Sequence, residues 1–246
     1  MANKKNTHIK MLILSLALIV IFLSVEVVSV PVGPTITYVK NETSPNAGLA
    51  TARSGDRGGY ITTVNLNAAQ QNYAWKAYVG NVTGIMVLEN ALNYSIYEWP
   101  VSLGSSQEVY ISRNNSVIWA SVSCSNRSII QAEDTFLSLN SSQSNSINRT
   151  FNVSTHRSFS VGAVPISNST CPAISTFLND AAQSSGEANK FQEVLLKDST
   201  SNLIYASLVD QDQAGFDNSL YDFQAIVGEN EVSGIPTTYY FYVELG

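Results

Sequence analysis

The chain of 246 residues is poor in charge, cysteine and histidine. Lys, Arg, Asp and Glu make up 13% of it, about half of the roughly 25% usual in soluble domains. The acids outnumber the bases by 19 to 13, and the net charge is −6. This balance argues against a nucleic-acid partner, because such binding needs a basic surface that displaces counterions. The 44% of hydrophobic and 10% of aromatic residues predict a folded core rather than long disorder.

The sequence also lacks the short motifs of catalysis and cofactor binding. It has no G-x-S-x-G, S-x-x-K, H-E-x-x-H, G-x-G-x-x-G, P-loop or C-x-x-C pattern. His156 is the only histidine after the N-terminal segment, and its polar surroundings predict a surface position beside a strand. Paired carboxylates for glycoside hydrolysis remain an alternative, with Glu98 beside Trp99 and the pair Glu133–Asp134 as candidates. We expect no catalytic residues and no enzymatic activity.

Residues 1–30 have the pattern of an export signal or a membrane anchor. Lys4, Lys5 and Lys10 precede an apolar run from Met11 to Val25, which continues past Glu26 to Val30. The run fits a secretory signal, and at about 30 Å as a helix it is also long enough to span a bilayer. A buried N-terminal helix of a soluble domain is the third interpretation. The lysines favour a cytoplasmic N-terminus, so we expect the chain beyond residue 31 at the cell surface or in the extracellular space.

Nine Asn-x-Ser/Thr triplets and two cysteines agree with an extracellular location. All the triplets lie between residues 41 and 168, which predicts a glycoprotein with these acceptors on exposed loops or strand edges. The acceptor residues are Asn41, Asn81, Asn93, Asn114, Asn126, Asn140, Asn148, Asn152 and Asn168. The even number of cysteines, Cys124 and Cys171, predicts one disulfide in an oxidising compartment.

Short β-type runs separated by turn residues predict an all-β chain with one or two antiparallel β-sandwiches. One short helix near 128–139 is the exception, with Ser128 and Gln131 as a capping box. The runs at 84–88, 95–99, 191–197 and 203–208 are expected strands, and 116–122 is expected to form a hairpin with 108–112. After the N-terminal segment we expect a strand and linker at 31–59, a sequon-rich β domain at 60–170, and an acidic region at 171–246. The acidic region is either a second β domain or the second half of the same one.

The acidic region also contains alternate carboxylates that resemble calcium ligands. Asp210, Asp212 and Asp217 lie around a glycine turn at 215, and carboxylate oxygens suit a hard cation. The spacing does not match an EF-hand, and a solvated acidic loop is the alternative. Calcium is therefore the one cofactor worth testing.

The β-type run that directly follows the export segment is a candidate for assembly. Thr35, Ile36, Thr37, Tyr38 and Val39 precede a linker rich in small residues, so they have the freedom to complete the sheet of a neighbouring subunit. Such a contact is head-to-tail and gives a filament when it does not close. An ordinary first strand, or a stalk above a membrane anchor, is the alternative.

Several segments resemble a group of archaeal secreted proteins. They are Gly58–Asn67 (GGYITTVNLN), Trp75–Gly84 (WKAYVGNVTG), Gln131–Asp134 (QAED) and Phe241–Leu245 (FYVEL). The export signal and sequon density resemble archaeal pilins, thread subunits and cell-wall glycoproteins, although the Lys10–Met11 junction lacks the small residue of a prepilin cleavage point. The resemblance implies a surface glycoprotein and brings no catalytic or ligand residues.

The expected function is therefore structural or adhesive work at the cell surface, with the membrane or other copies of the chain as partner. The alternative is a membrane-anchored module that binds or cleaves cell-surface glycans. In that case Trp75, Trp99 and Trp119 are the candidates for a sugar platform, and buried strand aromatics are their ordinary interpretation.

Overall fold

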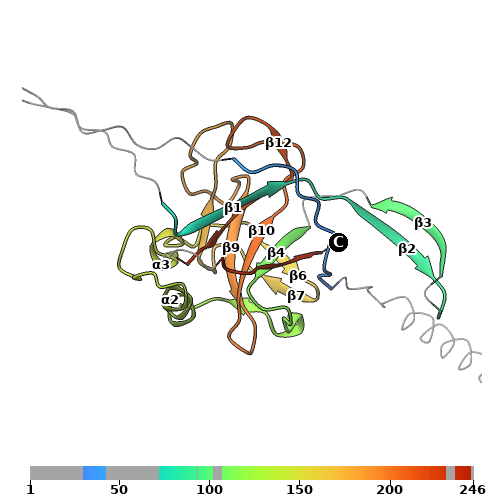
Figure 1. The fold of residues 1–246 in the computed structure, drawn as a ribbon, viewed down its shortest axis with the longest axis horizontal. Helices are drawn as coiled ribbons and strands as arrows, with labels where there is room; N and C mark the ends of the chain where they lie inside the picture. The colour runs from blue at the N-terminus through green and yellow to red at the C-terminus, as the bar shows by residue number, and fades with distance from the viewer. Residues whose placement is uncertain (1–29, 43–71, 93, 102–106, 231–235, 245–246) are drawn as a thin grey trace, which may run out of the picture.

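A six-stranded antiparallel sheet forms the centre of the molecule (Figure 1). The structure is a computed structural model, and it describes residues 30–42, 72–92, 94–101, 107–230 and 236–244. The strands of the sheet lie in the order β14-β4-β10-β9-β5, and β8 also pairs with β9. Their bounds are Tyr240–Val243 (β14), Glu108–Ser112 (β4), Leu203–Leu208 (β10), Gln192–Lys197 (β9), Ser123–Cys124 (β5) and Ala173–Ser175 (β8). The prediction of a mostly β chain with antiparallel sheets and few helices is confirmed.

Both faces of the central sheet are buried, and each face carries its own hydrophobic cluster. On β4, Val109 and Ile111 belong to one cluster and Tyr110 to the other, as the alternation of side chains along a strand requires. On β10, Tyr205 belongs to the same cluster as Val109, and Ile204 belongs to the same cluster as Tyr110. The apolar residues at the centre of β4, β9 and β10 are therefore consecutive and do not alternate with polar ones.

Different elements cover the two faces. The pair formed by β1 (Trp75–Gly80) and β13 (Phe223–Gly228), with α2 (Arg127–Phe136) and α3 (Ile147–Thr150), covers the face of Val109. The pair formed by β6 (Phe159–Val161) and β7 (Val164–Ile166), with the 3-10 turn η1 (Trp119–Ser121), covers the face of Tyr110. A small pair of β11 (Gln213–Ala214) and β12 (Leu220–Tyr221) lies apart from both covering layers.

Strands from before and after residue 170 share the central sheet. β4 lies between β14 and β10, and β5 pairs with β9. The predicted disulfide is confirmed: Cys124 and Cys171 are bonded, with their Cα atoms 4.8 Å apart. The bond ties β5 to the segment just before β8.

The predicted strand at 116–122 is wrong. Both edges of β4 are taken, because Ser112 lies opposite Ile204 of β10 on one side and Tyr240 of β14 on the other. The chain turns into η1 instead, and the Trp119 ring packs between Tyr110 and Tyr242 at 5.1 and 5.0 Å between ring centroids.

The predicted helix is present as α2, but its cap differs from the prediction. Asn126 is the N-cap, and its Oδ1 accepts the Ile129 N–H at 3.0 Å. Ser128 lies inside the helix and donates its hydroxyl to the same Asn126 oxygen. The short helix α3 was not predicted. Its N-terminus is capped by Ser146, and the buried carboxylate of Asp134 on α2 accepts the Ile147 N–H at 2.8 Å.

Residues 35–39 form no strand in the structure, so the alternative of an ordinary first strand is wrong, while strand addition to a neighbouring subunit stays a prediction. All five are exposed. The N-terminal segment instead pairs at Val32, which forms an isolated antiparallel bridge to Val243 on the outer edge of β14. The apolar run before Val30 lies outside the described residues.

Candidate interaction surface: a projecting apolar hairpin

The hairpin of β2 (Gly84–Glu89) and β3 (Ser95–Val101) projects from the rest of the described chain (Figure 1). Within the part of the chain that the structure describes, its two strands pair only with each other. Its described side chains beyond Gly84 are exposed, most of them apolar, with Leu92 at the turn reaching 75%. An isolated two-stranded hairpin is marginally stable in water, and contiguous exposed apolar surface marks interaction sites. Among the described residues, the hairpin is therefore the surface that most requires a partner.

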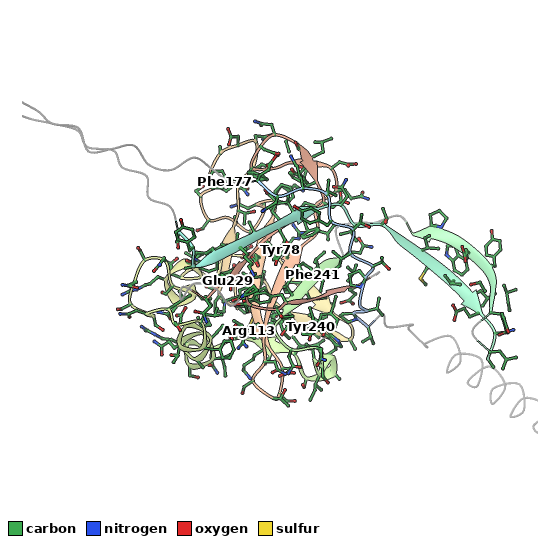
Figure 2. All side chains as sticks on the ribbon, in the orientation of Figure 1. Tyr78, Arg113, Phe177, Glu229, Tyr240 and Phe241 are labelled. Atoms are coloured by element: carbon green, nitrogen blue, oxygen red, sulfur yellow. A yellow bond between two sulfur atoms is a disulfide. The ribbon has the colours of Figure 1, made fainter. Side chains whose placement is uncertain are left out.

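The register of the strands gives the hairpin two apolar faces. The aromatic face carries Met86, Leu88, Tyr97 and Trp99, since Met86 lies opposite Trp99 and Leu88 opposite Tyr97. The aliphatic face carries Ile85, Val87, Ile96 and Pro100, together with the carboxylate of Glu98. Figure 2 shows side chains standing out from both sides of this ribbon. A partner that covers one face alone leaves the other in water.

Local sequence explains why these residues form a hairpin. Ile85 and Val87 in β2, and the β-branched and aromatic residues that dominate β3, favour extended backbone. At the turn, the Oδ1 of Asn90 accepts the N–H groups of Leu92 and Tyr94 at 2.9 and 3.1 Å, and the Asn90 N–H donates to the Tyr94 carbonyl. An asparagine that bonds its own following backbone in this way closes a turn without glycine.

The root of the hairpin is fixed to the body by a buried carboxylate. Asp222 Oδ2 accepts the Val82 N–H at 2.8 Å, and the Asp222 N–H donates to the Gly80 carbonyl at 2.9 Å. Its other oxygen, Oδ1, accepts the Asp212 N–H at 3.0 Å. Val82 itself is buried. The hairpin therefore leaves the body from a defined position at the end of β1.

The sequence predicted strands here but not their exposure. The run Ile85-Met86-Val87-Leu88 has no polar alternation, and such a run is typical of a strand buried on both faces. The structure places it in solvent instead. The sequence pattern of these residues is the same for a strand that is buried in its own chain and for a strand that is exposed to bind a partner.

The predicted glycan acceptors lie mostly at the surface. Asn41, Asn81, Asn126, Asn140, Asn152 and Asn168 are exposed. Asn114 and Asn148 are half-buried, and their Nδ2 groups donate to Asn202 Oδ1 and to the Ser141 carbonyl respectively. Asn93 lies outside the described residues.

The prediction of a surface position for His156 is wrong, because its side chain is fully buried. Nδ1 lies 2.7 Å from the Arg157 carbonyl, and Nε2 accepts the N–H groups of Thr170 and Cys171 at 3.1 and 3.0 Å. This arrangement requires the neutral ring with its proton on Nδ1. Burial lowers the pKa of His156, so the histidine serves as a neutral hydrogen-bond bridge beside the disulfide.

The structure gives no support to the calcium interpretation. The buried Asp210 carboxylate is paired with Arg157 and Lys190 at 3.0 and 3.1 Å. Asp217 accepts from the Ser219 N–H and the Tyr221 hydroxyl. Across the described part of the chain, no group of three or more His, Cys, Asp or Glu side chains is arranged to hold a metal ion.

The remaining predicted candidates are dispersed or engaged. Glu133 pairs with Arg113, with Nε–Oε1 at 2.6 Å, while the neighbouring Asp134 caps α3. Glu98 lies on the projecting hairpin, far from this pair in the fold (Figure 1). The three tryptophans do not form one platform. Trp75 packs against Phe151, Trp119 packs against Tyr110, and Trp99 is on the hairpin.

A buried pair of carboxyl groups was not predicted. Glu108 and Glu244 are neighbours on β4 and the end of β14, where the Glu244 N–H donates to the Glu108 carbonyl at 3.1 Å. Tyr110 donates its hydroxyl to Glu244 Oε2 at 2.8 Å. Burial, reinforced by the Glu244 carboxylate, raises the pKa of Glu108 to about 8. Glu108 of this pair therefore keeps its proton at neutral pH.

No protein-family model matches the chain, and comparison with curated proteins and with solved structures finds no match either. Among the helices of the described residues, none is both long and apolar enough to cross a membrane. The expected anchor or signal at 1–30 lies almost wholly outside these residues. The interpretation of the hairpin therefore rests on its geometry.

Proposed function

We propose that the protein is an exported, non-enzymatic cell-surface glycoprotein that does structural or adhesive work. The observation that carries this proposal is the projecting β2–β3 hairpin, whose apolar side chains are exposed on both faces. A chain that must stay soluble alone has no use for such an element, whereas a subunit that attaches to another molecule does. The disulfide and the exposed sequons support a location outside the cytosol.

The finer features of this proposal come from the sequence. We propose that residues 1–30 direct export, as a cleaved signal or a retained anchor, and that the exposed asparagines of the sequons carry glycans. The antiparallel layers of the body then serve as a rigid support, in the manner of a β-sandwich. The hairpin provides the attachment.

The test uses intact cells that produce the full chain. A membrane-impermeant biotin reagent should label the protein, and enzymatic or chemical deglycosylation should lower its mass. The variant Leu88→Lys, which places a charge on the aromatic face, should be exported and folded but released from the cell surface or its fibres into the medium. Leu220→Lys is the matched control, since Leu220 on β12 is 57% exposed and Leu88 52%.

A protein found inside the cell with reduced thiols and no sugar contradicts the proposal. Equal retention of the Leu88→Lys and Leu220→Lys variants at the surface also contradicts it, because the hairpin then plays no part in attachment.

A further inference from the structure

The hairpin places two separate demands on its partner. Its faces need apolar cover, and its outer strand edges carry backbone N–H and C=O groups that need hydrogen bonds. Lipid satisfies the first demand but not the second, because an open sheet edge is not tolerated in the hydrocarbon region. A sheet with a free edge of its own satisfies both. A β-sheet protein is therefore the kind of partner that satisfies both demands once the hairpin is covered.

This chain itself presents such an edge on β14. Val243 exchanges two hydrogen bonds with Val32, at 2.9 and 2.8 Å, on the side of β14 that faces away from β4. Since backbone groups alternate in direction along a strand, the N–H and C=O of Phe241 point to the same outer side. Within the described residues no strand pairs with them. On this outer edge the backbone of Val243 is therefore hydrogen-bonded, and within the described residues the backbone of Phe241 is unpaired.

Proline explains why the N-terminal segment does not continue along the edge. Extending the antiparallel register from Val32 and Val243 by two residues places Pro34 opposite Phe241. Proline has no N–H to donate to the Phe241 carbonyl. The pairing of Val32 therefore shows that this edge accepts an antiparallel strand. The N-terminal segment pairs at this one position and not at Phe241.

Aromatic side chains lie next to the unpaired backbone of Phe241. Tyr240 is exposed, and the Phe241 ring lies against Tyr78 of β1 in an edge-to-face contact at 5.0 Å between centroids (Figure 2). This contact brings β1 and β14 together on one side of the molecule. A strand added at Phe241 thus finds both backbone hydrogen-bonding groups and apolar surface.

We propose that the hairpin of one copy of this chain docks on the β14 edge of a second copy, with β2 as the added strand. β2 is favoured over β3 because β3 contains Pro100, which has no N–H to donate, whereas β2 contains no proline. The hairpin projects away from the body that holds β14 (Figure 1), so each copy offers its hairpin to another. The two contact surfaces differ, and the contact is therefore heterologous, which produces open-ended growth when successive contacts do not close into a ring. This inference rests on the proposed structural function and names its partner.

The experiment separates the two surfaces by variants of the full chain. Leu88→Lys impairs the hairpin and leaves the edge intact. Phe241→Pro removes the outward N–H and leaves the hairpin intact, and an outward-facing position of an edge strand is where proline is tolerated. Mass photometry and sedimentation velocity over a concentration series measure the size of the particles.

The wild-type chain and the control Leu220→Lys should form species that grow with concentration. Each of the two impaired variants alone should stay monomeric. Their equimolar mixture should form a dimer that does not grow further, because the one intact hairpin meets the one intact edge. A mixture that stays monomeric overturns the inference, as does a Phe241→Pro variant that assembles like the wild type.

A second measurement guards against misfolding of the proline variant. A photo-reactive amino acid at position 97 in unlabelled chain should crosslink to residues 236–244 of a ¹⁵N-labelled copy. Crosslinks confined within one copy show that the chain covers its own hairpin and overturn the inference. A wild-type chain that is monomeric yet held at the cell surface through its hairpin also overturns it, while leaving the proposed function intact.

Discussion

His156 shows how one buried side chain sets the properties of its surroundings. Its two ring nitrogens connect the Arg157 carbonyl with the N–H groups of Thr170 and Cys171. The polar sequence around it suggested a solvent position. The ring is buried because it is the acceptor that these two N–H groups need once the chain packs against the disulfide.

Replacing this histidine should cost stability in a pH-dependent way. The pKa of His156 is lowered in the folded state, so the histidine contributes its full stability above about pH 6.5, the ordinary pKa of the free side chain. That contribution is lost as the pH falls through the lowered value, because unfolding then takes up a proton. His156→Phe should lower the free energy of unfolding by about 1–3 kcal/mol at pH 7, since two buried N–H groups lose their acceptor.

Urea unfolding between pH 5 and 7 measures both effects. The difference between wild type and variant should shrink towards pH 5. A difference that is constant across this range contradicts the protonation argument, although the loss of hydrogen bonds would stand.

The Glu108 and Glu244 pair should have the opposite pH dependence. The pKa of Glu108 is raised to about 8 from an ordinary 4.5, chiefly by burial. Its stabilising contribution is therefore complete below about pH 4.5 and is lost as the pH rises towards 8. Glu108→Gln keeps the shape and removes the titration, so the stability of this variant should fall less than that of the wild type between pH 5 and 8. The free energy of unfolding is measured against pH for both proteins. If the two curves run parallel between pH 5 and 8, Glu108 is already ionised in the folded state.

At the scale of elements, helix α2 depends on its cap more than on its composition. The helix has no acidic residue in its first turn and no basic residue in its last turn. The Asn126 side chain supplies the acceptor for the Ile129 N–H, and the Arg113–Glu133 pair ties the helix to the end of β4. A single polar side chain thus determines where α2 begins.

Asn126→Ala should lower the free energy of unfolding by about 0.5–2 kcal/mol, the usual effect of losing an N-cap. Asn126 is also a predicted glycan acceptor, so the control is Asn126→Asp. Aspartate keeps the capping oxygen and removes the sequon. Thermal or urea unfolding of the unglycosylated proteins should rank the aspartate variant near the wild type and the alanine variant below it. Equal loss in both variants would show that the cap contributes nothing.

The disulfide acts on the whole molecule. It joins Cys124 of β5 to Cys171, which precedes β8, at a sequence separation of 47, and the segment between them contains α2, α3 and the β6–β7 pair. Closing a loop of this length restricts the unfolded chain and stabilises the fold by about 2–4 kcal/mol. The bond therefore holds together elements that cover opposite faces of the central sheet.

The double variant Cys124→Ala, Cys171→Ala should unfold at a clearly lower urea concentration while keeping its far-ultraviolet circular dichroism at 25 °C. The same shift should follow reduction of the wild-type bond. An unchanged unfolding midpoint would mean that the loop is already restricted by other contacts in the unfolded chain.

The sequence by itself determined the local features of this protein. Apolar runs bounded by turn residues predicted strands at 191–197 and 203–208, where the structure has β9 and β10. Two cysteines in a chain with an export pattern were enough to predict the bond between them.

Only the tertiary structure decided which apolar strands are buried and which await a partner. Val194 to Leu196 and Ile85 to Leu88 are both continuous apolar runs, yet the first lies in the centre of the sheet and the second projects into solvent. Burial depends on which strands occupy the neighbouring edges, and pairing between strands far apart in the chain is not encoded in the period of either one. The same reason explains the lost strand at 116–122, since β10 and β14 had already filled both edges of β4.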